Sequence, residues 1–422
     1  MDQGPSETES GVAVRPRLHS SEQDGDPRWR VTLSVMWVAQ LCAIMGFSFV
    51  MPFIPFFVRE LGVSERMVPI WAGLTTTGSG IAMAVVSPIW GYLADRRGRK
   101  LMVQRAMFGG AIALGLMGFS RNIWDLLILR TLQGAVTGTV SACIALVSSV
   151  VPRNRLGFSL GLMQMAVFMG GSVGPYLGGF IADRYGYRTP FGVTAGLLLT
   201  GGVLVLFGAH ERFTPPETER EALPIRARRL LGEPAVLGLL GVFFIMNVSI
   251  SFVGPIFPLF VEQIIGEKES AATKTGVLLA VAGVASAFSA VAIGRLSDRI
   301  GHKRVLVFCT VLSGVLVIPH FFANSLNQLL ALRLVFGLAA GGMMPAMNAL
   351  VVSLVPRNSI GQAYGFTATA SALGWAIGPA IGGLAASAFG YRWPFVFMGG
   401  LLLLVSLAQV KWITIGKQQE EL

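Results

Sequence analysis

Long apolar runs separated by short polar loops are the main pattern along this 422-residue chain. Most runs reach the roughly 20 residues that a helix needs to cross about 30 Å of hydrocarbon at 1.5 Å per residue. Hydrocarbon offers no water to backbone groups, and the runs lack the apolar–polar alternation of barrel strands. The pattern therefore predicts an all-α membrane protein. Its twelve predicted spans are residues 31–58, 68–93, 101–120, 125–151, 157–181, 190–209, 235–263, 273–294, 304–323, 328–355, 361–388 and 394–412.

The chain contains one unit twice. The segment Gly91–Lys100 returns as Gly294–Lys303 at an offset of 203 positions, and Gly174–Gly179 returns as Gly378–Gly383 at an offset of 204. A repeat of about 200 residues is far longer than the roughly 20 to 50 residues of a solenoid, so each copy is predicted to be a six-helix bundle related to the other by pseudo-symmetry. The predicted parts are a disordered cytoplasmic tail (1–30), an N-terminal bundle (31–209), a central cytoplasmic loop (210–234), a C-terminal bundle (235–412) and a cytoplasmic tail (413–422).

Composition and charge support a membrane location. Hydrophobic residues make up 53% of the chain and charged residues 13%, with a mean hydropathy of +0.65. With the N-terminus inside, 23 Lys and Arg residues lie in cytoplasmic segments and eight lie on the opposite side. The bias predicts a multi-pass protein of the cell inner (plasma) membrane with both termini cytoplasmic, and the net charge of +11 also suits anionic membrane lipid. The cations are scattered among short loops, so nucleic-acid binding is not expected.

The loop between the second and third predicted spans carries a recognisable motif. Its sequence, Gly-Tyr-Leu-Ala-Asp-Arg-Arg-Gly-Arg-Lys, together with six plus six spans and a long central loop, resembles the major facilitator superfamily over essentially the whole chain. The resemblance implies the major facilitator fold. It also implies that the loop controls conformation, with Asp95 contacting residues 358–361 in the outward-facing state; topogenic charge alone is the alternative. The gating residues implied for this loop are Gly91, Asp95, Arg96, Gly98, Arg99 and Lys100.

The fifth span carries a second motif, around Gly174, Pro175, Gly178 and Gly179. Glycines admit a neighbouring backbone and proline removes one helix hydrogen bond, so close helix contact and a bend are expected. The motif resembles the one that separates antiporters from symporters in the superfamily, where it is thought to seal the non-cytoplasmic side against leak. It therefore favours an exporter, although plain helix packing would also select glycines. Proline pairs in the outer halves of the first and seventh spans predict either gates or static kinks.

Proton coupling requires a titrating group that meets both sides of the membrane in turn. The best candidates are Asp125, Arg130 and Asp95: the intramembrane Arg130 needs an acceptor, and Asp125 lies five residues before it. An interfacial Asp125 that only caps the fourth span is an equally good interpretation. Arg333 is the repeat counterpart of Arg130, and a structural role is predicted for it.

The substrate is expected between the bundles at mid-depth, in contact with soft or polar side chains. The candidates are Gln40, Met45, Phe49, Gln164, Phe168, Phe243, Asn247, Met343, Asn348 and Tyr364, each of which also suits packing. With no carboxylate predicted at mid-depth, the substrates are expected to be amphipathic small molecules, neutral or anionic ones included.

These features predict a secondary active transporter that exports drugs or other amphipathic small molecules by proton antiport and acts as a monomer. A proton-coupled importer or facilitator of a sugar, nutrient or metabolite is the alternative, and a non-transporting membrane sensor is a third. The histidines and the three cysteines share no metal-ligand spacing, and no phosphate-binding loop is present. No enzyme activity, metal site or cofactor is therefore expected.

Overall fold

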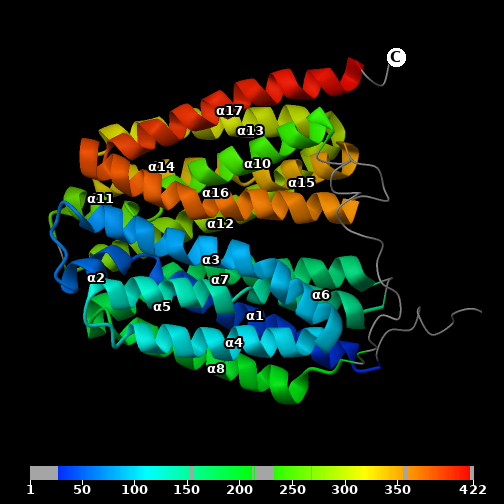
Figure 1. The fold of residues 1–422 in the computed structure, drawn as a ribbon. Helices are drawn as coiled ribbons and strands as arrows, with labels where there is room; N and C mark the ends of the chain where they lie inside the picture. The colour runs from blue at the N-terminus through cyan, green and yellow to red at the C-terminus, as the bar shows by residue number, and fades with distance from the viewer. Residues whose placement is uncertain are drawn as a thin grey trace, which may run out of the picture.

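The computed structural model describes residues 27–152, 155–211, 213, 232–267, 269–354 and 360–418. Helices dominate, and they form two bundles that lie side by side (Figure 1). The N-terminal bundle contains α1 (Trp29–Val50), α2 (Ile54–Glu60), α3 (Val68–Arg97), α4 (Arg99–Met117), α5 (Ile123–Val136), α6 (Thr139–Val150), α7 (Leu156–Tyr185) and α8 (Thr189–Gly208). The C-terminal bundle contains α10 (Pro234–Phe252), α11 (Phe257–Ile265), α12 (Ala271–Ile300), α13 (His302–Val317), the 3-10 helix η2 (Ile318–Phe322), α14 (Leu326–Ala340), α15 (Met343–Leu354), α16 (Ile360–Phe389) and α17 (Trp393–Gln418).

Eleven helical segments of the described chain are long and apolar enough to cross a membrane. The predicted span at 101–120 is α4, which is not one of them, because Arg99, Lys100 and Arg105 raise the charge of its first two turns. It nevertheless packs against α5 and α8. The all-α membrane fold predicted from the sequence is therefore confirmed, with α4 completing the N-terminal set of six by its position.

Four predicted spans are broken helices. The first span divides into α1 and α2 at residues 51–53, and the seventh divides into α10 and α11 at residues 253–256, next to the proline pairs that led to the prediction of gates or kinks. The fourth span also divides, into α5 and α6, at Gly138, whose φ of 110° favours glycine. The tenth divides into α14 and α15 at residues 341–342. The breaks in the fourth and tenth spans were not predicted.

The repeat is visible in the packing of aromatic rings. Phe57 on α2 packs against Phe191 on α8 with ring centroids 5.1 Å apart. Phe260 on α11 packs in the same way against Phe395 on α17, at 4.7 Å. All four rings are buried and occupy corresponding positions in the two copies. Each bundle therefore closes the α2–α11 end, the end opposite the chain termini, with a matching aromatic contact (Figure 1).

Two helix pairs join the bundles: α7 packs against α12, and α3 packs against α16. Glycines allow both contacts. A Cβ on Gly179 would lie 2.2 Å from the carbonyl oxygen of Ala272, and one on Gly276 would lie 2.2 Å from that of Pro175. At the matching seam, a Cβ on Gly73 would lie 2.3 Å from the carbonyl oxygen of Pro379. Backbone therefore meets backbone at both seams, which only a residue without a side chain permits.

Candidate functional site

An ion pair joins the bundles at the α2–α11 end. Nη1 and Nη2 of Arg59 donate to the two carboxylate oxygens of Glu262, both at 2.8 Å. Nε of Arg59 also lies 2.8 Å from Glu65. The hydrogen bond with Glu262 holds the pKa of Arg59 above its ordinary value. Two parallel bonds make this a strong, geometrically specific contact between the bundles.

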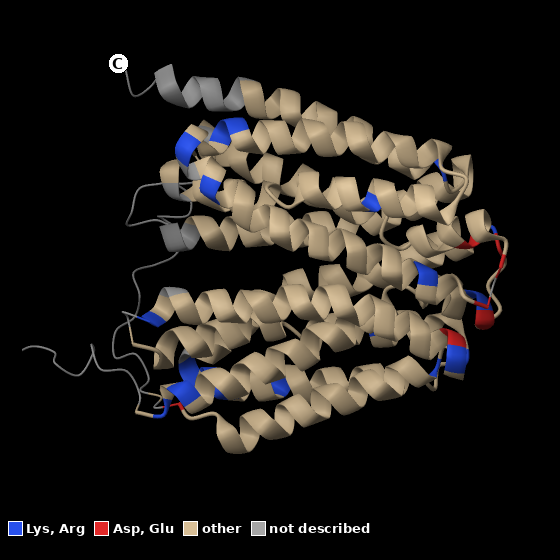
Figure 2. Ribbon diagram, turned by 180° about the vertical axis from the view of Figure 1, so that it is seen from behind, with Lys and Arg blue, Asp and Glu red and all other residues tan. Residues whose placement is uncertain are grey.

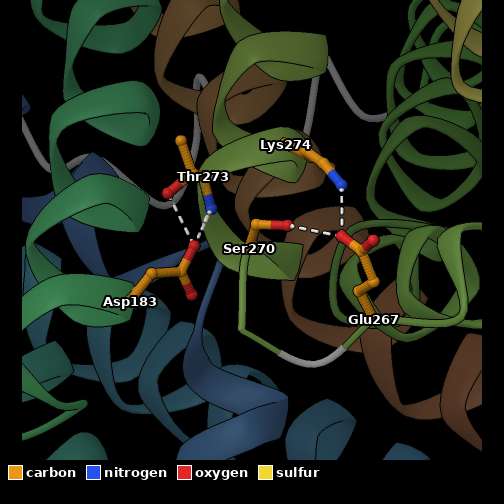
Figure 3. A network of polar contacts seen from close by, with 5 residues as sticks. All are labelled: Asp183, Glu267, Ser270, Thr273 and Lys274. Carbon is orange, nitrogen blue, oxygen red and sulfur yellow. Dashed lines mark hydrogen bonds and ion pairs between the residues drawn. The ribbon is translucent and has the colours of Figure 1, made fainter.

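A second polar contact lies at the same end (Figure 3). Oδ2 of Asp183 on α7 accepts hydrogen bonds from the backbone nitrogen of Thr273 at 2.7 Å and from its hydroxyl at 2.6 Å. The fifth span was predicted over residues 157–181, which left Asp183 outside the helix. The structure corrects this: α7 continues to Tyr185, so the carboxylate belongs to a helix of the seam. A sequence signal was present, since an Asp lies one turn after Gly179.

The phenol of Tyr187 lies near these carboxylates, in the turn between α7 and α8. Burial, with a smaller contribution from the charges of Asp183 and Glu262, raises the pKa of Tyr187 to about 12. Its ring stacks on Phe53 with centroids 6.2 Å apart. The phenol is therefore neutral at physiological pH and offers no charge to the seam.

The glycine motif of α7 faces two neighbours. A Cβ on Gly174 would lie 2.7 Å from Cβ of Ser48, and one on Gly178 would lie 2.3 Å from the carbonyl oxygen of Phe49, both on α1. One residue further, Gly179 meets α12 of the other bundle. The motif thus joins α1, whose residues were predicted to line the substrate site, to the seam between the bundles.

The loop between α3 and α4 is organised by the start of the central loop. Oε1 and Oε2 of Glu211 accept the backbone N–H groups of Arg99 and Lys100 at 2.9 and 2.7 Å. Nζ of Lys100 donates to the carbonyl oxygen of Leu206 at 2.9 Å. Gly98 turns the chain with φ of 95°. A carboxylate at the first turn of a helix satisfies free amides and the helix dipole, and the role of Glu211 was not predicted.

The predicted contact of Asp95 with residues 358–361 cannot be located, because the side chain of Asp95 and residues 355–359 lie outside the described structure. Of the other predicted gating residues in this loop, Arg96 lies over the ring of Tyr92 at 4.5 Å, and a Cβ added to Gly91 would meet open space. The conformational role of the loop remains a prediction.

The coupling candidates Asp125 and Arg130 do not bond to each other; each has a different partner. Asp125 lies in the first turn of α5, which Asn122 caps: Asn122 Oδ1 accepts the Asp125 amide at 2.9 Å, and Asp125 Oδ2 accepts the Arg121 amide at 3.0 Å. Arg130 donates to Oε1 of Gln133 at 3.0 Å instead of to Asp125. The contacts of Asp125 thus agree with the alternative interpretation, in which it caps the fourth span.

Arg333, the repeat counterpart of Arg130, is buried under aromatic rings. Its guanidinium carbon lies 3.6 Å from the ring centroid of Phe257 and 6.0 Å from that of Phe336. Cation–π contacts of desolvated groups are worth about 2 kcal/mol. Arg130 and Arg333 therefore share a position in the repeat but not an environment.

The break in the fourth span is held by two donors that sequence reasoning did not identify. Trp90 Nε1 donates to the carbonyl oxygen of Ala135 at 2.7 Å, and Nη2 of Arg105 donates to that of Thr137 at 3.2 Å. The Arg105 guanidinium stacks on the Trp90 ring at 3.6 Å. At the matching break, the hydroxyls of Ser286 and Ser289 donate to carbonyls of α14. At each break, two backbone carbonyls thus accept a hydrogen bond from a side chain.

The predicted substrate residues divide into two groups. Five are buried in helix contacts, and two of these make hydrogen bonds: Gln40 donates to the Met163 carbonyl oxygen at 3.0 Å, and Asn247 donates to that of Phe243 at 2.7 Å. The buried group is Gln40, Phe49, Phe243, Asn247 and Met343. The group with exposed or half-buried side chains is Met45, Gln164, Phe168, Asn348 and Tyr364. Tyr364 donates to the Asn348 carbonyl oxygen at 3.1 Å, which joins α16 to α15.

Charge is unevenly distributed between the two ends (Figure 2). Lys and Arg gather at the end where the chain termini lie, whereas the opposite end carries both signs, including the Arg59–Glu262 pair. No group of three or more His, Cys, Asp or Glu residues that could hold a metal ion occurs in the described ranges.

Comparisons with known proteins agree with this architecture. The family model described as Major Facilitator Superfamily matches residues 36–274 and 252–421. The chain is similar to Multidrug resistance protein MdtG of Citrobacter koseri, with 34% identity over 405 residues, 95% of this chain and 99% of that protein. It is 35% identical to the MdtG protein of Serratia proteamaculans over 387 residues, 91% and 93% of the two chains.

Solved structures share the fold at low sequence identity. A bacterial homologue of the human lysosomal transporter Spinster, in an inward-facing and occupied conformation, has a TM-score of 0.76 and 15% identity over 92% of this chain and 97% of its own. The human organic anion transporter MFSD10 has a TM-score of 0.68 and 18% identity, over 91% of this chain and 100% of its own.

Proposed function

The chain belongs to the major facilitator superfamily, and from this premise we propose that it exports drugs and other amphipathic small molecules in exchange for protons. Transport proceeds by alternating access, in which two bundles rock about a substrate site between them. The energy comes from the proton gradient, and one copy of the chain carries out the cycle. The relatives named for multidrug resistance, similar over nearly the whole chain, support the export of drugs.

The observation that carries the proposal is the contact made by the glycine motif of α7. Gly178 touches α1, which is predicted to line the substrate site, and Gly179 touches α12 across the seam. One stretch of α7 backbone therefore contacts both the predicted substrate site and the other bundle. A sealed stretch of this kind suits an exporter, because it limits leak of substrate and protons along α7.

The orientation follows from the distribution of charge. Positive residues gather at the end that holds the chain termini (Figure 2), and cytoplasmic loops carry an excess of Lys and Arg. The termini are therefore cytoplasmic, and the α2–α11 end faces outward across an inner (plasma) membrane. The Arg59–Glu262 and Asp183–Thr273 contacts then close the outward side.

The coupling site lies in the N-terminal bundle, with Asp95, Asp125 and Arg130 as candidates. Arg130 is the strongest of the three for a role in coupling, because its hydrogen bond to Gln133 leaves its charge without a carboxylate among its described contacts. Proton binding at Asp95 or Asp125 biases the equilibrium between the two conformations. The substrate lies nearer to the exposed candidates, Gln164, Phe168, Asn348 and Tyr364, than to the buried ones.

Accumulation of fluorescent amphipathic dyes tests export. Cells that express the protein are expected to accumulate less dye than cells with empty vector, and a protonophore should abolish the difference. No difference across several dyes of different charge would contradict the proposal and favour a metabolite transporter.

Purified protein in proteoliposomes with an imposed pH gradient tests coupling. Asp95→Asn and Asp125→Asn isolate the two carboxylates, and loss of pH-driven transport in one of them identifies the coupling group. Wild-type coupling in both variants would overturn the assignment to these carboxylates.

A further inference from the structure

Asp183 on α7 caps a helix of the other bundle (Figure 3). The backbone amide and the hydroxyl of Thr273 both donate to its Oδ2, and Thr273 is the third residue of α12. The first amides of a helix lack partners within the helix and are usually satisfied by the side chain of the residue just before it. That residue here, Ser270, makes no such bond; its hydroxyl contacts Glu267 instead. The cap of α12 therefore comes from the opposite bundle.

We propose that Asp183 is a positioning residue of the transport cycle, a charged latch that holds the α2–α11 end closed. The proposal rests on the function proposed above, since it assumes that this end opens during transport. It concerns a residue outside both motifs that resemble the family.

The position of the latch matches the glycine contact. Asp183 lies four residues, about one helical turn, after Gly179, and the two residues face successive residues of α12, Thr273 and Ala272. The glycine lets the backbones meet, and the carboxylate then fixes the register of α12 against α7. A shift of α12 away from α7 breaks both hydrogen bonds and exposes the free amide.

No cation neutralises the latch among its described contacts. Lys274, the nearest charged residue on α12, donates to Glu267 at 2.9 Å, and Arg59 is bonded to Glu262 and Glu65. Oδ1 of Asp183 is buried without a hydrogen-bond partner in the described structure. The negative charge is therefore stabilised chiefly by the Thr273 groups and the positive N-terminal end of α12. These hydrogen bonds exist only while the bundles touch, so they favour the closed end.

The matching seam has a neutral contact. Ser387 on α16 occupies the position that corresponds to Asp183 at an offset of 204, and its hydroxyl donates to the Arg66 carbonyl oxygen at 2.9 Å. That contact involves no charge and no free helix amide. The two seams are thus alike in their glycines and different in their latches, which makes Ser387 a matched control.

The conformational equilibrium can be measured apart from transport. Spin labels at Phe119→Cys and Phe322→Cys report on the α2–α11 end, because these residues correspond in the two copies and are 78% and 69% exposed. The labels are placed on a background without Cys42, Cys143 and Cys309, and distance distributions are recorded in lipid nanodiscs.

Asp183→Asn keeps the shape and one acceptor but removes the charge, and Asp183→Ala removes both. We expect Asp183→Ala to lower the ratio of closed to open populations about tenfold, equivalent to about 1.4 kcal/mol, and Asp183→Asn to lower it by a smaller factor. Ser387→Ala should change the ratio less than twofold. Unchanged distributions in Asp183→Asn and Asp183→Ala, or an equal shift in Ser387→Ala, would overturn the proposal.

Thr273→Val supplies a test that leaves α7 intact, since it removes the hydroxyl donor and keeps the amide. A shift toward the open population supports the latch even where Asp183→Ala fails to fold, and no shift counts against it. Dye efflux is measured on the same variants. A latch that responds as expected in a protein that exports no dye would show that the export proposal fails while the latch stands.

Discussion

Arg59 and Glu262 occupy the same position in the two copies of the repeat, 203 residues apart, and they bond to each other across the pseudo-symmetry axis. The two copies carry opposite charges at this position, where two like charges would repel. Both side chains are partly shielded, with 23% and 13% of their surface exposed. The contact that closes the α2–α11 end is thus a product of divergence between the copies.

Glu262→Gln should destabilise the closed form, because hydrogen bonds to charged groups contribute about 1.5–3 kcal/mol. The double variant with Arg59→Glu and Glu262→Arg should recover part of the lost stability, although Glu65 then faces a carboxylate. Thermal unfolding in detergent of Arg59→Glu, Glu262→Arg and the double variant forms a double-mutant cycle, which measures the coupling energy of the pair. Additive effects of the two single variants would show that the pair contributes nothing.

The effect of a substitution in the glycine motif of α7 should depend on what each glycine contacts. Gly179→Ala drives a methyl group into the backbone of α12, and such overpacking costs about 1–3 kcal/mol. Gly171→Ala is the control, since its Cβ would meet open space and alanine favours helix by about 0.5–1 kcal/mol. Dye efflux should fall at least tenfold in Gly179→Ala and stay at the wild-type level in Gly171→Ala. Equal efflux in the two variants would contradict the role of the motif.

Glu211→Ala should destabilise the start of α4, because two backbone amides lose their acceptor. Loss of a helix cap typically costs about 1 kcal/mol. Glu233→Ala is the matched control, since Glu233 precedes α10 without a side-chain cap bond. Hydrogen exchange at residues 99–102 is expected to rise only in Glu211→Ala, and equal exchange in both variants would speak against the cap.

Arg130→Gln and Arg333→Gln should separate function from stability. Arg333 lies over Phe257, so its loss should lower the unfolding free energy by about 2 kcal/mol. Arg130→Gln is expected to reduce pH-driven transport at least tenfold with a smaller change in unfolding. Unfolding temperature and coupled transport are measured on the same samples. The reverse pattern would move the coupling role to the C-terminal bundle.

The break between α5 and α6 should depend on its glycine. Gly138→Ala forces a side chain into positive φ, at a cost of about 1–2 kcal/mol, whereas Gly161→Ala on α7 is tolerated because its Cβ meets open space. Trp90→Phe keeps the ring beneath Arg105 but removes the bond to Ala135, worth about 1 kcal/mol. Thermal unfolding checks all three variants. An unchanged unfolding temperature in Gly138→Ala would contradict the requirement for glycine at this break.

The sequence by itself determined the architecture, because the requirement for backbone hydrogen bonds in lipid leaves long apolar runs no choice but helix. The doubled loop and glycine motifs showed two bundles, and the proline pairs marked the breaks next to Pro52 and Pro255. The local sequence did not indicate the break at Gly138. The donors that bond its neighbouring carbonyls, Trp90 and Arg105, lie on other helices, so they are not part of the local pattern.

Tertiary structure decided which polar residues meet. Asp125 was expected near Arg130 because they are close in sequence, yet a local cap satisfies the aspartate and Gln133 satisfies the arginine. Asp183 was expected outside the fifth span, yet it caps a helix 90 residues away in the chain. Hydropathy indicates whether a residue lies in lipid or in water, and the internal repeat indicates which residue of the other copy corresponds to it. Neither reports which unsatisfied amide of a distant helix lies within 3 Å of a carboxylate, because that distance is set by the packing of two bundles.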